Sequence, residues 1–209
     1  MIEALQQISV LIGIWVAIYG IDSWRREHVG KRQMELAEEA LALFYEAEDA
    51  INHIRHPMSF STETEHIERG EQETESQFQA RKNASVVFHR YNEHQELFNK
   101  IHAMRYRFMA QIGKAEAEPF DELRKILNEI ILSARMLARL WSRDHFRTDE
   151  QWERHHEEIA RHEAVFWGGA SEDAVVIKVK SAISKIERSC RDIISEKNSL
   201  HGMLKAKLW

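Results

Sequence analysis

Near its start, this chain has eighteen consecutive residues without a charge, ALQQISVLIGIWVAIYGI. At about 1.5 Å of rise per residue, a helix of that length measures roughly 27 Å, close to the hydrocarbon thickness of a bilayer. A secretory signal is not expected, because Glu3 precedes the run and no small-residue cleavage site follows it. Residues 1–24 are therefore expected to form a transmembrane anchor. The alternative is a soluble core helix, since Gln6 and Gln7 dilute the run.

A basic cluster directly follows this run. Arg25, Arg26, Lys31 and Arg32 come after Trp24, and the positive-inside bias then favours a cytoplasmic chain with its N-terminus outside. Trp24 and the four basic residues are expected to be the anchors at the membrane interface, because tryptophan and basic side chains favour the headgroup layer. The sequence thus predicts a single-pass protein of the cell inner membrane, with the lipid bilayer as its first partner.

Small residues recur along one side of the run. Ser9, Gly13 and Ala17 are four apart, and Gly20 and Gln6 fall near the same face. Small side chains let helices approach closely in lipid. These five residues are therefore expected to form the interface of a homo-oligomer within the membrane.

The rest of the chain, residues 25–209, reads as a cytosolic helical-bundle domain. Two prolines and eight glycines are few for 209 residues, which favours an all-α fold. Apolar residues recur at helical spacing and predict a bundle of about five helices. Their expected limits are 34–56, 78–111, 120–141, a helix that starts at the Thr148 capping box and stops at Gly168, and a last helix capped by Ser171.

Charge is distributed unevenly over this domain. Residues 61–76 hold six glutamates and one arginine, a sum of minus five that equals the net charge of the chain. The remainder sums to zero, so nucleic acid is not indicated as a partner. Residues 58–76 are expected to be a mobile acidic loop. Positions 178–209 carry eight basic residues and three acids. A protein partner could bind the acidic loop or this basic C-terminal helix.

A few polar residues interrupt the apolar stripes. Glu48 and Arg55 do so on the first cytosolic helix, and His94 and Arg105 on the second. If these helices pack antiparallel, Glu48, His94 and Arg105 would form a buried pocket for a ligand or for catalysis. The interpretation that we favour is a paired structural network at the edge of the bundle.

Two other patterns suggest enzymatic chemistry. RLWSRDH, from Arg139 to His145, has the length of the catalytic motif of the helical nucleases called HEPN proteins, although Leu140 stands where that family has Asn, Asp or His. His155, Glu158 and His162 share a helical face and could hold a metal, but a charged solvated face explains the spacing better. No cofactor motif or catalytic residue is assigned, and an enzyme is the less favoured class.

Three stretches carry a resemblance that covers most of the chain. AIYGIDSWRREHVGKRQMELAEEALALFYEAEDAI, QELFNKIHAMRYRFMA and HEAVFW resemble a widespread group of bacterial membrane-anchored helical proteins with no assigned function. The layout is also similar to that of membrane effectors of bacterial antiviral systems, including CRISPR-associated pore formers. The resulting hypothesis is a self-associating membrane protein that acts by assembly or partner binding, with a membrane-perturbing or pore-forming effector in bacterial defence as one form. The alternative is a membrane-tethered HEPN-like nuclease or metal-dependent hydrolase.

Overall fold

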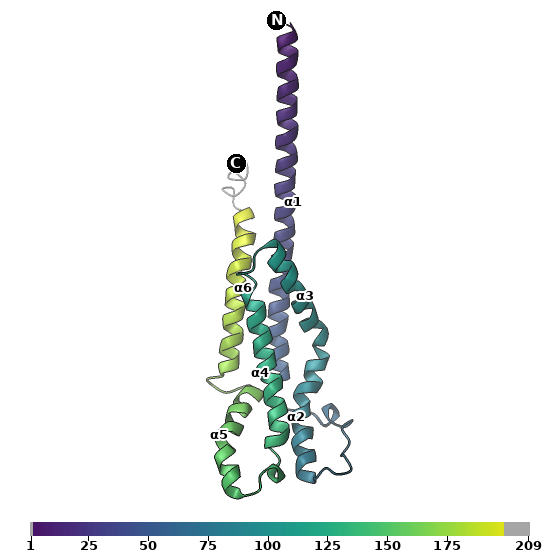
Figure 1. Cartoon of the computed structure of the whole chain (residues 1–209), viewed down its shortest axis with the longest axis vertical. Coiled ribbons are helices and arrows are strands. Elements are labelled where there is room, and N and C mark those ends of the chain that lie inside the picture. Colours follow the sequence, from purple (N-terminus) through teal and green to yellow (C-terminus); the bar gives the residue numbers. More distant parts are fainter. Residues whose placement is uncertain (1, 199–209) are drawn as a thin grey trace. The chain divides into compact units, whose positions relative to one another are not determined.

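A computed structural model describes residues 2–198, with side chains at positions 10 and 12–195. Six α-helices and two short 3-10 helices account for most of this range, and no strand lies within it (Figure 1). This confirms the predicted all-α class. The elements are α1 Ile2–Ile54, η1 Ser61–Glu63, α2 Glu75–Glu93, α3 Gln95–Gln111, α4 Glu118–Leu140, η2 Arg143–His145, α5 Asp149–Phe166 and α6 Ala174–Asn198.

Capping residues explain where several helices start. Thr74 and Gln77 form a capping box at α2, in which each side chain bonds the other's backbone N–H. Thr148 accepts the backbone N–H of Gln151 at α5, as predicted. The prediction was wrong at α6, because Asp173 rather than Ser171 precedes the helix and accepts the N–H of Val175. A carboxylate also interacts favourably with the positive end of the helix dipole.

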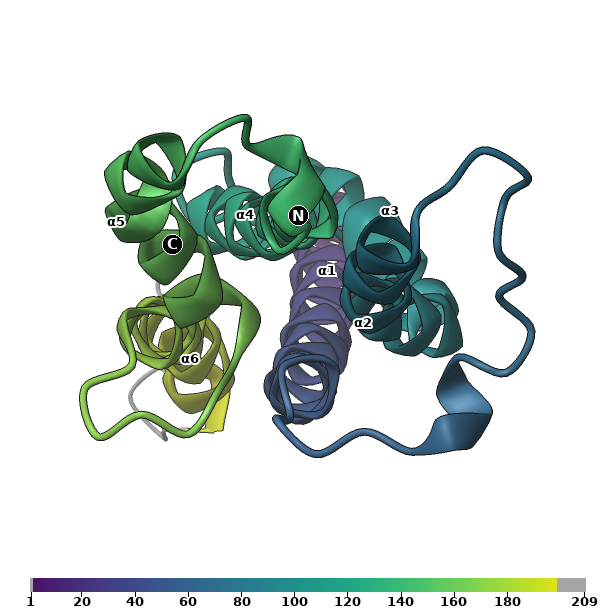
Figure 2. The same cartoon turned by 90° about the horizontal axis from the view of Figure 1, so that it is seen from below.

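The chain divides into two units. One unit takes in residues 42–186 and is organised around α4, which lies between α2 and α5 (Figure 2). The α4 face predicted to be apolar is buried along its whole length. At its start, Phe120 packs edge-on against Phe44 of α1, with ring centroids 4.9 Å apart, and lies 5.3 Å from Phe108 of α3. Burial of one broad stripe is what holds an amphipathic helix in a bundle.

The other unit takes in residues 1–41 and 187–209. Leu36, Ala37 and Ala40 are buried on α1, and Cys190 is buried on α6. Burial raises the pKa of the Cys190 thiol to about 12. The large apolar side chains described between Val10 and Val29 are instead exposed.

The predicted transmembrane helix is not supported. Within residues 2–198, no helix is both long enough and apolar enough to cross a membrane. Among the residues whose side chains are described, the apolar sequence ends at Ile21, and Asp22, Arg25 and Arg26 follow it directly. The expected inner-membrane topology stays a prediction.

Two helix boundaries also differ from expectation. The anchor and the first cytosolic helix were expected as separate elements, but α1 is continuous from Ile2 to Ile54, roughly 80 Å at 1.5 Å per residue. The helix expected over 78–111 is instead divided at His94, whose N–H bonds to the carbonyl of Tyr91 in a tight turn. The described part of the chain therefore has six α-helices, in which α1 replaces the expected anchor and first bundle helix, and α2 and α3 replace the second bundle helix.

The residues of the expected acidic loop form local structure. They include η1 and the first two residues of α2. Glu63 is buried, and Glu73 accepts two hydrogen bonds from Arg81, both of 2.7 Å. These bonds hold the pKa of Glu73 down at about 2. Individual carboxylates of this stretch thus have arginine partners, and the mobility of the loop stays a prediction.

Candidate functional site

The first candidate surface is the exposed apolar segment of α1, positions 10–24. Its large apolar side chains are each 39–67% exposed and occur on every side of the helix: Val10, Ile12, Ile14, Trp15, Val16, Ile18, Tyr19, Ile21 and Trp24. Soluble helices normally expose a polar face. An apolar helix surface of this kind marks a site of interaction with lipid or protein.

Aromatic and basic residues border the exposed apolar segment. Trp15 stacks on Tyr19 with ring centroids 5.6 Å apart, and Trp24 stacks on His28 at 5.5 Å. The predicted interface cations all lie exposed directly after the segment: Arg25, Arg26, Lys31 and Arg32. The segment thus passes from apolar to aromatic to cationic surface within a few turns.

The small residues lie on the same segment. Gly13, Ala17 and Gly20 are exposed. A Cβ atom added at Gly13 or Gly20 would meet no other atom within 4 Å, so packing within the chain does not require glycine there. The side chains of Gln6 and Ser9 lie outside the described part of the structure, as does the C-terminal end from residue 199.

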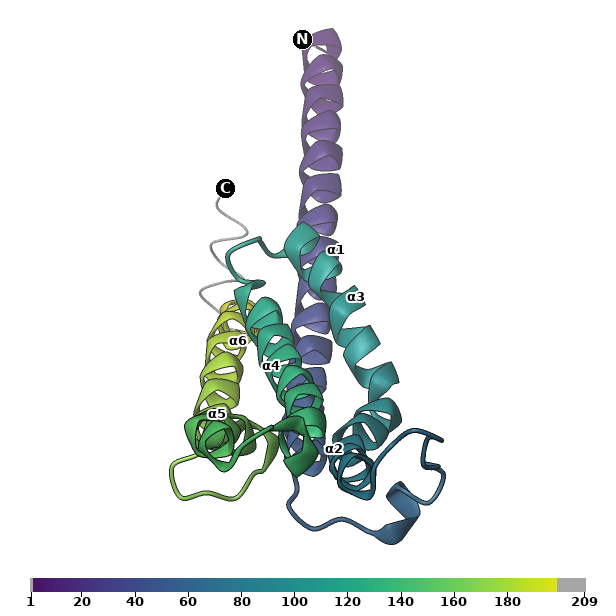
Figure 3. The same ribbon diagram turned by 60° about the horizontal axis from the view of Figure 1, so that its bottom comes forward.

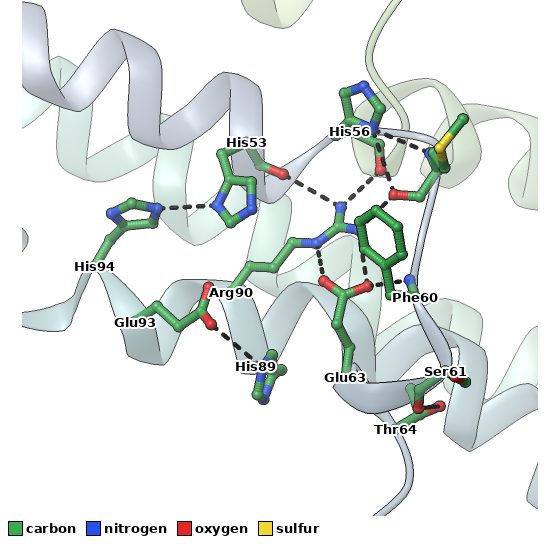
Figure 4. Close-up of polar contacts among 11 residues, drawn as sticks. His53, His56, Phe60, Ser61, Glu63, Thr64, His89, Arg90, Glu93 and His94 are labelled. Atoms are coloured by element: carbon green, nitrogen blue, oxygen red, sulfur yellow. Dashed lines mark hydrogen bonds and ion pairs between the residues drawn. The ribbon is translucent and has the colours of Figure 1, made fainter.

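The second candidate is a buried polar cluster around Arg90 of α2 (Figure 4). Arg90 is 2% exposed, yet all five of its N–H groups are satisfied. Nε and Nη2 bind the two carboxylate oxygens of Glu63 at 2.6 and 3.1 Å. Nη1 donates to the carbonyls of His53 and His56 at 3.2 and 2.7 Å, and Nη2 donates to that of Met58 at 2.6 Å. Arg90 therefore caps the carbonyl end of α1 and fixes the following loop, where cations are favoured by the helix dipole.

The charges of this cluster are matched. Hydrogen bonds from Arg90 lower the pKa of Glu63, and the N–H of Phe60, 2.7 Å from Oε2, lowers it further against the opposing effect of burial. Glu63 is thus a carboxylate at neutral pH. Because all five donors of Arg90 are engaged and Glu63 accepts three hydrogen bonds, the pair is suited to holding structure rather than to moving protons.

Two histidines meet beside Arg90. His53 Nδ1 lies 3.0 Å from His94 Nε2, which joins the end of α1 to the break between α2 and α3. Partial burial, the charge of Arg90 and the neighbouring His94 all lower the pKa of His53. One imidazole of such a pair must be neutral for one ring to donate and the other to accept.

Arg55 forms a second buried cluster on the far side of the α1 end. Its Nε and Nη2 donate to the last carbonyls of α5, those of Val165, Ala164 and Trp167, at 2.7, 3.0 and 2.8 Å. Its Nη1 binds Asp173 at 2.9 Å. Burial by itself raises the pKa of Asp173, but the hydrogen bond and charge of Arg55 with two backbone N–H groups outweigh it and lower the pKa overall.

The residues predicted for a catalytic pocket are not brought together. His94 pairs with His53, and Arg105 Nη2 binds Asp121 at 2.7 Å. Glu48 is half-buried on α1 and shares no described hydrogen bond with either of them. The HEPN-like pair, Arg139 at the end of α4 and His145 in η2, is exposed.

The predicted metal ligands have other partners. His155 Nδ1 bonds the carbonyl of Gln151 at 2.7 Å, and His162 Nδ1 bonds the Ser133 hydroxyl at 3.1 Å. Among the residues that the structure describes, no three His, Cys, Asp or Glu side chains are grouped to hold a metal, Glu158 included.

Comparisons with protein families, curated proteins and solved structures find no match. The resemblances drawn from the sequence therefore stay predictions, and the function has to be argued from this structure.

Sequence reasoning missed the two residues that organise the polar clusters, Arg90 and Asp173. Arg90 follows Val86 and Val87 on the buried face of its helix, so an arginine at a core position was a signal in the sequence. Asp173 carried no such signal, since short polar residues before a helix are common.

Proposed function

We propose that this protein is a membrane-attached, self-associating helical protein that acts by assembly or partner binding. The observation that carries the proposal is the exposed apolar segment of α1, whose described side chains from position 10 to Ile21 are apolar on all sides of the helix. Apolar contacts on every side suit immersion in lipid, since docking on one protein surface would cover one stripe only.

The flanking residues support attachment to a bilayer. Exposed Trp24 suits the headgroup layer, where an aromatic ring with a polar edge is favoured. The basic residues that follow would face anionic lipids, and each such contact contributes about 1 kcal/mol near a charged surface. The basic residues and the exposed apolar segment therefore both favour the same partner, an anionic bilayer.

The glycines of the segment support self-association. Glycine in a helix interior costs about 1 kcal/mol relative to alanine, and the free space around Gly13 and Gly20 offers no compensation within the chain. Close approach of helices in lipid would use that space, because small residues let the backbones touch.

Vesicle flotation tests the attachment. Purified full-length protein should float with phosphatidylglycerol-containing vesicles, and the double variant Ile14→Lys with Ile18→Lys should stay in the dense fraction. The matched control is Leu132→Lys with Ile177→Lys, whose apolar side chains are 56% and 63% exposed against 52% and 61% for the test pair. Equal flotation of the two double variants, or no flotation of the parent, would contradict the proposal.

A further inference from the structure

A cavity of about 210 Å³ lies between α3 and α4. It exists because the break at His94 redirects the chain. While α2 packs along α4, α3 approaches α4 closely only near the turn that joins them, where Phe108 meets Phe120 (Figure 3). The rings of Tyr91 and Phe98 stack across the break at 5.6 Å, and both line the cavity.

Part of the cavity lining is apolar. Phe98 and Ile101 of α3 and Phe120 and Leu123 of α4 contribute to it, and all four side chains are buried. A surface of this kind favours the hydrocarbon part of a ligand.

The rim carries excess positive charge. Arg105 binds Asp121 at 2.7 Å, and Arg124 Nη2 lies 3.3 Å from the other oxygen of the same carboxylate. Two guanidinium groups thus share one carboxylate. The Nε of Arg105 is buried and has no hydrogen-bond partner, and Asp121 Oδ1 has ion-pair proximity to Arg124 but no hydrogen bond. A buried donor without an acceptor is costly and marks a place where an acceptor is expected.

Other polar groups without negative charge line the cavity. They are the amides of Asn99 and Asn128 and the ring of His102. They supply donors and acceptors without cancelling the positive charge.

We propose that this cavity binds a small organic anion, with its carboxylate on Arg105 and Arg124 and its hydrocarbon body against Phe98, Phe120 and Leu123. Arginine suits this role because its planar fork matches a carboxylate. At about 30 Å³ for each water-sized group, the volume admits a hydrocarbon body of about seven non-hydrogen atoms, with the carboxylate at the rim. This ligand site is independent of the exposed apolar segment of α1 and so goes beyond the proposed membrane attachment.

The test uses 4-fluorobenzoate as the probe, observed by fluorine NMR against the full-length protein in a non-ionic detergent at constant ionic strength. Saturable binding is expected, and Arg124→Gln should weaken it at least fivefold. Arg124 is suited to substitution because it is 57% exposed, whereas Arg105 is 20% exposed and is held by Asp121. Arg135→Gln, an exposed arginine further along α4, is the matched control and should bind the probe like the parent.

Three outcomes would overturn the site. The first is absence of saturable binding by the parent. The second is unchanged affinity in Arg124→Gln, which would place the probe elsewhere. The third is displacement of the probe by 4-fluorobenzamide or by inorganic phosphate at the concentration at which benzoate displaces it. Either result would remove the need for a carboxylate joined to a hydrocarbon body.

Discussion

At the scale of single residues, Arg90 makes the end of α1 depend on one carboxylate. Its five N–H groups are all engaged, and only Glu63 supplies a compensating charge within hydrogen-bond distance. A lysine could not replace it, because an ammonium has three donors and no planar fork. Arginine and lysine carry the same charge, but only arginine has enough donors, in the right geometry, for this position.

Replacing Glu63 with Gln should lower the free energy of unfolding by about 3 kcal/mol, because it leaves the Arg90 charge buried without a counter-ion. Urea denaturation followed by circular dichroism measures the change. Glu73→Gln is the control. Its partner Arg81 has a side chain 43% exposed, so solvent screening should make the loss smaller. Equal losses in the two variants would contradict the importance of burial.

The His53 site should make stability depend on pH below the ordinary histidine pKa of 6.5. Since the folded state lowers the pKa of His53, the unfolded chain binds that proton more readily and acid favours unfolding. The stabilisation is fully present above the ordinary histidine pKa of 6.5 and is lost as the pH falls through the lowered folded value. Thermal midpoints at several pH values should show a shallower decline in His53→Gln than in the parent. The exposed control His156→Gln should decline like the parent, and identical slopes for all three proteins would exclude the effect.

At the scale of elements, the sequence predicted helices well and their junctions poorly. The stripes on α4 and α5 were recognised because apolar spacing is a local signal, and Thr148 was recognised because a capping box is one too. The break at His94 has neither glycine nor proline to mark it. It lies instead at a tertiary contact with His53, 41 positions away. The partners of Arg55 and of Arg90 were missed for the same reason, since they are distant in sequence.

The turn between α5 and α6 contains one backbone position that needs glycine. Gly169 has φ of +96°, a conformation that side chains rarely adopt. Gly169→Ala should therefore cost about 1 kcal/mol of unfolding free energy. Gly70→Ala is the control, because Gly70 has no positive φ and an added Cβ would make only ordinary contacts at 3.6 Å. Chemical denaturation should show little change for Gly70→Ala, and an equal cost in both variants would rule out backbone strain as the cause.

At the scale of the whole molecule, assembly is the property that the proposed function requires. If Gly13 lies in a helix-to-helix contact, Gly13→Leu should hold the helices apart and lower the oligomeric state in detergent. Light scattering coupled to size-exclusion chromatography measures the mass. Ile18→Leu, on a different side of the helix, keeps the side-chain volume and should leave the mass unchanged. The same mass for Gly13→Leu and the parent would show that the glycine face does not make the contact.

The two arginine clusters also differ in when they can form as the chain is synthesised. Arg90 lies 27 to 37 positions from its partners, so its cluster needs only the first ninety or so residues of the chain. Arg55 lies 109 to 118 positions from its partners. Closing so long a loop is slower and entropically more costly. During translation the Arg55 guanidinium must therefore stay hydrated until Asp173 has left the ribosome, long after the partners of Arg90 have been synthesised.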